Sequence, residues 1–150
     1  MTEEYRKEII IRDFSIRDYE ELIEMWVESG LSFKPEGRDS REKIGKELEG
    51  GAGSLLIAEM GGKIAGSVLV THDGRKGWIN RLAVLPELRG KGIGGKLASE
   101  AQKKLDEAGI EITASLIEED NTDSILFFRK LGFKRHDGII YFTRRKHPGV

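Results

Sequence analysis

The spacing of hydrophobic residues changes along the chain, and each change separates a predicted strand from a predicted helix. A β-branched run at Glu8–Phe14 predicts the first strand. The apolar residues of Tyr19–Val27 recur at intervals of three and four, which predicts a helix capped by Ser15 or Asp18. The chain therefore opens with a strand and an amphipathic helix.

The next segment is polar until the pattern of strands begins. Ser29–Asp39 mixes glycine, proline and charge, which predicts a loop, and Ser40 would cap a polar helix to about Glu49. Ser54–Met60 and Lys63–Thr71 then flank a Gly-Gly pair that supplies the positive φ of a two-residue turn. These two runs predict a β-hairpin.

The second half predicts more strands and helices and no linker or repeat, so residues 1–150 form one domain. The expected elements are strands at Trp78–Val84 and Ile110–Leu116, helices from Gly92 to Ala108 and from Asp120 or Asn121 to Leu131, and final strands at Phe133–Asp137 and Ile139–Arg144. The order β-α-α-β-β-β-α-β-α-β-β predicts a mixed α/β fold, with helices on the faces of one sheet.

Composition excludes several classes of function. Twenty-five Lys and Arg balance 26 Asp and Glu, and a net charge of −1 argues against nucleic-acid binding. The absence of cysteine excludes disulfides, thiolate metal sites and cysteine nucleophiles, and the three histidines show no metal-ligand spacing. No apolar run approaches the ~20 residues of a membrane span. We therefore expect a soluble, cytoplasmic protein without a metal and without nucleic-acid or membrane partners.

Glycines and cations concentrate between a predicted strand and the longest predicted helix. Glycine lets a backbone approach a ligand closely, and the following helix contributes the positive end of its dipole. Arg89, Lys91 and Lys96 add positive charge. This segment, the glycine loop, comprises Arg89, Gly90, Lys91, Gly92, Ile93, Gly94, Gly95 and Lys96. It predicts a binding site for an anion such as a phosphate, although a glycine-rich turn with a solvated basic rim is the simpler alternative.

Two nucleotide-binding motifs fit the glycine loop only partly. Gly90, Gly92 and Gly95 have the G-x-G-x-x-G spacing of dinucleotide-binding folds, but four residues separate the loop from the strand. Gly90–Lys96 matches the G-x-x-x-x-G-K of a phosphate loop, but Leu97 occupies the position of the magnesium-binding Ser or Thr. Both alternatives predict binding of NAD or ATP.

The segment Leu82–Gly94 closely resembles the acetyl-CoA-binding motif of the GNAT acyltransferases. Arg89, Gly92 and Gly94 meet that family's R/Q-x-x-G-x-G/A pattern between the fourth strand and the third helix. A second similarity begins at Asn121 and continues through Phe127–Phe133, which resembles the family's N…(F)YEKLGF. The resemblance extends over about Ile9 to Arg144.

The resemblance implies a mostly antiparallel sheet that splays between its fourth and fifth strands, with about four flanking helices. Pantetheine would lie in the resulting cleft and the pyrophosphate on the glycine loop, so acetyl-CoA is the implied cosubstrate. The implied cofactor-binding residues are Leu82, Ala83, Val84, Arg89, Gly90, Lys91, Gly92, Ile93, Gly94, Gly95, Lys96, Asn121, Phe128 and Arg129.

The implied reaction is direct transfer of an acetyl group to a primary amine of a small molecule or an amino acid. The family often has a tyrosine as general acid where this chain has Phe128, so water or Tyr141 would supply the proton. Candidate groups for amine deprotonation are Asn80, Glu118 and, less directly, Glu59. A peptide α-amine is the alternative acceptor, and an inactive acyl-CoA-binding module is the alternative from another class. Many family members form homodimers through their last strands, which makes a homodimer a further expectation.

Overall fold

The computed structural model describes residues 8–51 and 53–150, and its centre is one five-stranded sheet in the order β1-β2-β3-β4-β5. The first four strands pair antiparallel and β4 pairs parallel to β5. The strands are β1 (Ile9–Asp13), β2 (Gly53–Met60), β3 (Lys63–His72), β4 (Lys76–Val84) and β5 (Ile112–Ala114). The helices are α1 (Tyr19–Ser29), α2 (Arg41–Glu49), α3 (Ile93–Glu107) and α4 (Thr122–Lys130), with short 3-10 turns η2 (Ile16–Asp18) and η3 (Pro86–Leu88).

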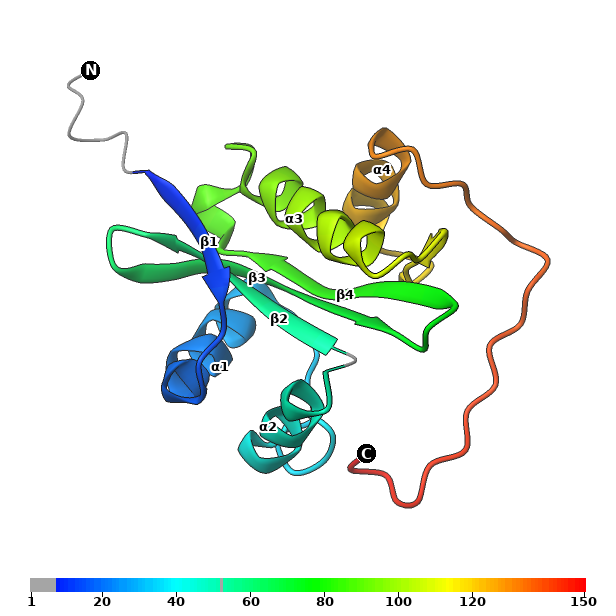
Figure 1. Ribbon diagram of the computed structural model, residues 1–150, viewed down its shortest axis with the longest axis horizontal. Helices are drawn as coiled ribbons and strands as arrows, with labels where there is room; N and C mark the ends of the chain where they lie inside the picture. Colours follow the sequence, from blue (N-terminus) through cyan, green and yellow to red (C-terminus); the bar gives the residue numbers. More distant parts are fainter. Residues whose placement is uncertain (1–7, 52) are drawn as a thin grey trace.

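Helices cover both faces of the sheet. Figure 1 shows α1 and α2 on one face and α3 and α4 on the other. Each face has its own hydrophobic cluster: Trp26 and Leu22 of α1 lie in one, and Leu97 of α3 and Phe128 of α4 lie in the other. The predicted mixed α/β fold is therefore confirmed, and no helix of the described residues is long and apolar enough to span a bilayer.

Local sequence signals account for the ends of the elements. Ser40 caps α2 by accepting a hydrogen bond from the Lys43 backbone N–H, as predicted. The hairpin between β2 and β3 turns at Gly61 and Gly62, whose φ values of 59° and 79° lie in the left-handed region. Only glycine adopts this conformation without strain, so the Gly-Gly pair determines the turn.

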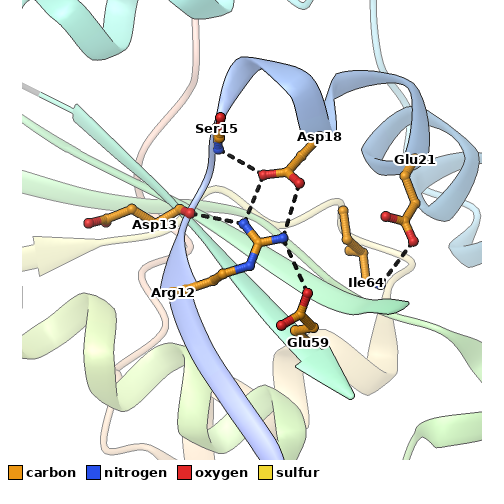
Figure 2. A network of polar contacts seen from close by, with 7 residues as sticks. All are labelled: Arg12, Asp13, Ser15, Asp18, Glu21, Glu59 and Ile64. Carbon is orange, nitrogen blue, oxygen red and sulfur yellow. Dashed lines mark hydrogen bonds and ion pairs between the residues drawn. The ribbon is translucent and has the colours of Figure 1, made fainter. Parts of the chain in front are cut away.

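A polar network fixes the corner between β1 and α1. Figure 2 shows the Arg12 guanidinium between the carboxylates of Asp18 and Glu59. Its two terminal nitrogens donate to the two Asp18 oxygens at 2.8 and 3.0 Å, while Asp18 also accepts from the Ser15 N–H at 2.8 Å. The Arg12 hydrogen bond holds the pKa of Asp18 below its ordinary value, and Asp18 in turn raises the pKa of Arg12.

The two strands predicted after α4 are absent, and this part of the sequence-based prediction was wrong. Phe133–Asp137 and Ile139–Arg144 contain no strand, and the side chains from Ile139 to Phe142 are 69–86% exposed. A strand exists through its pairing with a neighbour, and β-rich composition alone does not provide that neighbour. β5 is also shorter than the predicted Ile110–Leu116, because only Lys76–Trp78 of β4 runs beside it.

Candidate active site

The sheet opens at β4. Pairing between β4 and β5 begins at Lys76 and Ile112 and ends at Trp78 and Ala114, although β4 continues to Val84. In the described part of the chain, the outer backbone edge of this second half of β4 therefore faces no strand. Such an edge carries N–H and C=O groups that can pair with an extended ligand.

A β-bulge lies in this open half of β4. Ala83 pairs with Ser67 and Asn80 pairs with Leu69, so one residue of β3 faces two residues of β4. The extra residue changes the alternation of side chains along β4. Ile79, before the bulge, packs in the cluster beneath α3, whereas Ala83, after the bulge, packs in the cluster beneath α1. Without the bulge, two residues four positions apart on a strand would share a face.

Buried polar contacts hold the bulge in place. The Trp26 indole Nε1–H donates to the Ser67 hydroxyl at 2.8 Å, and that hydroxyl donates to the Arg81 carbonyl oxygen at 3.2 Å. Gly66 is required beside the bulge, because a Cβ there would lie 2.7 Å from the Ala83 carbonyl oxygen. Sequence analysis missed Ser67 and Trp26 as supports of the site, because neither belongs to a motif.

The glycine loop turns directly into the N-terminus of α3. Gly90 and Gly92 have φ values of 81° and 83°, and Gly92 is the N-cap of α3 without a side-chain cap. A Cβ at Gly90, Gly92 or Gly95 would meet no atom within 4 Å, so the space above these residues is open. The first N–H groups of a helix have no intrahelical acceptor, and the helix dipole favours an anion there. The loop therefore fits a phosphate group.

The Arg89 side chain makes two hydrogen bonds to the backbone. Its Nε donates to the Val84 carbonyl oxygen at 3.1 Å and its Nη2 donates to the Ser29 carbonyl oxygen at 2.9 Å. Arg89 thus ties the glycine loop to the end of β4 and to the C-terminus of α1. Lys91 and Lys96 are exposed at the loop and remain its cationic side chains.

The second predicted motif lies on α4. The Asn121 side-chain oxygen accepts from the Ser124 N–H at 3.1 Å and caps the helix. The Phe127 ring would lie 3.5 Å from a Cβ on Gly94, which places α4 beside the first turn of α3. Phe128 is buried between Phe127 and Phe133, with ring centroids 5.5 and 5.1 Å away, whereas Arg129 is exposed.

The predicted catalytic groups do not all lie together. Asn80 is half-buried on β4 next to the bulge, and Glu118 is exposed in the segment that follows β5. Glu59 is engaged by Arg12 in the network of Figure 2, on β2. Tyr141 is 69% exposed in the C-terminal segment, and the strand expected to carry it is not formed. Of these four residues, only Asn80 lies in the open half of β4.

The open edge of β4 and the start of α3 together suit the binding of an extended ligand that carries a phosphate. An unpaired strand edge can bind an amide-containing chain, and the adjacent helix N-terminus can bind a phosphate. Backbone N–H groups at a bulge can stabilise an oxygen on which negative charge develops. Among the described residues, no group of three His, Cys, Asp or Glu side chains is placed to hold a metal ion.

The sequence matches the model of the "Acetyltransferase (GNAT) family" over residues 18–133. It is 33% identical over 136 residues to an acetyltransferase of Photorhabdus laumondii, covering 90% of this chain and 94% of that protein. An acetyltransferase of Yersinia enterocolitica is 34% identical over 134 residues, with 89% of this chain and 94% of that protein covered.

Solved structures with the same fold agree with the sequence comparison. The PaiA N-acetyltransferase of Thermoplasma acidophilum, in complex with coenzyme A, superposes with a TM-score of 0.76 and 28% identity, over 87% of this chain and 92% of that chain. AAC(6')-Iy, in complex with a bisubstrate analogue, has the same fold with a TM-score of 0.76 and 20% identity, over 92% of this chain and 99% of that chain.

Proposed function

The chain belongs to the GNAT family of acetyltransferases, and from this premise we propose that it transfers an acetyl group from acetyl-CoA directly to a primary amine of a small molecule or an amino acid. The observation that carries the proposal is the glycine loop at the start of α3, with open space above Gly90, Gly92 and Gly95. This loop adjoins the half of β4 that, within residues 8–51 and 53–150, pairs with β3 on one side and with no strand on the other. The related Thermoplasma protein was crystallised with coenzyme A, which supports the same donor here.

Each part of the donor has a matching part of the site in this proposal. The pyrophosphate binds the backbone N–H groups from Gly90 to Lys96, where Lys91 and Lys96 add charge. The pantetheine amides pair with the outer edge of β4 at Leu82–Val84, where the Val84 carbonyl oxygen also accepts from Arg89. Asn121 at the N-cap of α4 and Arg129 near its end flank the pantetheine. Phe128 contributes by packing α4 against the core.

The chemical step needs a neutral amine, a donor to the thioester oxygen and a proton for the leaving thiolate. A backbone N–H near the bulge of β4 donates to the thioester oxygen. Water protonates the thiolate, because Phe128 has no proton to give and Tyr141 lies in the exposed C-terminal segment. A thiol with a pKa near ~8.5 leaves as the thiolate with little assistance.

The amine loses its proton to water held near Asn80 or Glu118. This weak assistance favours an acceptor of low pKa: an α-amine titrates at ~7.7–8.0 and a lysine side chain at ~10.4. An amino acid is the first candidate for this reason, and a peptide α-amine is the alternative.

A thiol-release assay with acetyl-CoA tests the proposal. The amine panel contains free amino acids, spermidine and dipeptides with a free α-amine, and an N-acetylated dipeptide serves as the control without an acceptor. We expect CoA release above the control with one amine class, and a rate that rises with pH toward the amine pKa. CoA binding without release on any of these amines would favour the inactive acyl-CoA-binding module instead.

A further inference from the structure

Arg81 has a backbone conformation that other non-glycine residues of the described chain avoid. Its φ is +53°, and it is the one non-glycine residue with positive φ in residues 8–51 and 53–150. It lies within the bulge of β4, directly after Asn80. A left-handed conformation is unfavourable for a residue with a Cβ, and such strain persists where the surrounding contacts enforce it.

Ser67 holds the Arg81 backbone, and the loop between α1 and α2 holds its side chain. The guanidinium Nη2 donates to an Asp39 carboxylate oxygen at 2.7 Å, and Nη1 donates to the Ser32 carbonyl oxygen. The same guanidinium lies 5.6 Å from the Trp26 ring centroid. The side chains of Arg81 and Asp39 are only 13% and 7% exposed, so the ion pair is shielded from water.

Asp39 connects this ion pair to the rest of the loop. Its carboxylate accepts from the Lys34 N–H at 2.7 Å, and its carbonyl oxygen accepts from the Tyr19 hydroxyl at 2.8 Å. Arg89 holds the beginning of the loop through the Ser29 carbonyl oxygen. Residues 30–39 are therefore tied to the bulge through Arg81 and to one another through Asp39, and the end of α1 directly before them is tied to the glycine loop through Arg89.

We propose that Arg81 and Asp39 are positioning residues, which hold the 30–39 loop over the β4 bulge and so define the place of the amine acceptor. The inference rests on the proposed acetyl transfer. Neither side chain is offered as an acid or a base, since each is already engaged by the other. Burial lowers the pKa of Arg81 from its ordinary value, which agrees with a guanidinium withdrawn from water.

The test separates the side chain from the strained backbone. Arg81→Gly tolerates the positive φ and removes the guanidinium, Asp39→Asn removes the negative charge, and the double variant leaves no unpaired buried charge. We expect kcat/KM for the best amine of the panel to fall at least tenfold in Arg81→Gly and in the double variant, mainly through a higher acceptor KM. The Kd for CoA stays within about twofold of wild type.

Hydrogen exchange gives a readout that does not depend on acetyl transfer. We expect backbone amides of residues 30–39 to exchange at least tenfold faster in the double variant, while those of α3 are unchanged. The matched control is Arg12→Gln, which disrupts the ion pair of Figure 2 at a similar distance of 2.8 Å but away from the bulge. It should lower the melting temperature and leave kcat/KM and loop exchange unchanged.

The inference is overturned if the double variant keeps kcat/KM within threefold of wild type and the loop exchange does not change. It is also overturned if Arg12→Gln reduces kcat/KM as much as Arg81→Gly, because the effect would then be general destabilisation. A wild-type protein that does not bind CoA contradicts the proposed function instead, and the exchange experiment still reports on the loop.

Discussion

Replacing Gly92 by alanine adds one methyl group at the N-cap of α3, where φ is +83° and no atom lies within 4 Å of the new Cβ. In the free protein the methyl group meets nothing, so the cost comes from the left-handed backbone, which is about 1–2 kcal/mol for a residue with a Cβ. Gly109, at the opposite end of α3, has a φ of +76° and equally open surroundings. Gly109→Ala is therefore a matched control with about the same loss of stability.

Only Gly92 belongs to the loop that we assign to the pyrophosphate. A methyl group or a relaxed backbone there would disturb at least one N–H bond to a charged phosphate, and such a bond contributes about 1.5–3 kcal/mol. We expect the Kd for CoA to rise about ten- to a hundredfold in Gly92→Ala and to stay within about twofold in Gly109→Ala. Both variants should unfold at similarly reduced urea concentrations.

Calorimetric titration of CoA into each folded variant measures the difference, and urea unfolding measures the stabilities. Equal CoA affinities in the two variants would show that the pyrophosphate does not contact the start of α3. A loss of stability in Gly92→Ala alone would contradict the argument from backbone conformation.

Five further substitutions, at four positions, test what stabilises the fold. Asp18→Asn should make the free energy of unfolding decrease less between pH 6 and pH 2, which urea unfolding measures. The Asp18 carboxylate stabilises the fold above its unfolded pKa of ~3.9, and this stabilisation is lost as pH falls through the lower pKa of the folded state. Phe128→Ala should cost about 3–5 kcal/mol because the ring is buried, whereas Phe142→Ser, at an 86% exposed position, should change the free energy of unfolding by less than about 0.5 kcal/mol. Ser40→Ala should cost about 1 kcal/mol through loss of the N-cap of α2, and Ser40→Asp should retain most of that stability in the same unfolding assay.

Local signals predicted the elements whose ends depend on neighbouring residues. Three of these signals form in the structure as predicted: the Gly-Gly turn, the Ser40 cap and the helix stop at Gly109. Each depends on one or two residues, either through a side chain that caps a helix or through a glycine that has no side chain. The glycine loop belongs to the same class, because its shape is determined by its own glycines and by the helix that follows.

Features that depend on distant partners could not be predicted from the sequence. Ile139–Phe142 has strand-like composition but no paired neighbour, and it remains exposed. Asp39 and Arg81 are 42 residues apart, and no spacing indicates that a loop aspartate pairs with a strand arginine. The bulge of β4 could not be predicted from the sequence either, because it arises from the register between β3 and β4.

Calorimetric titration of the wild-type protein with CoA, NAD and ATP in separate experiments tests whether the glycine loop binds the pyrophosphate of CoA. We expect CoA to bind with a 1:1 stoichiometry and NAD and ATP to give no heat of binding, since the glycine loop adjoins an open strand edge that suits pantetheine. Absence of CoA binding, or binding of NAD or ATP in its place, would contradict the assignment of the glycine loop and with it the proposed acetyl transfer.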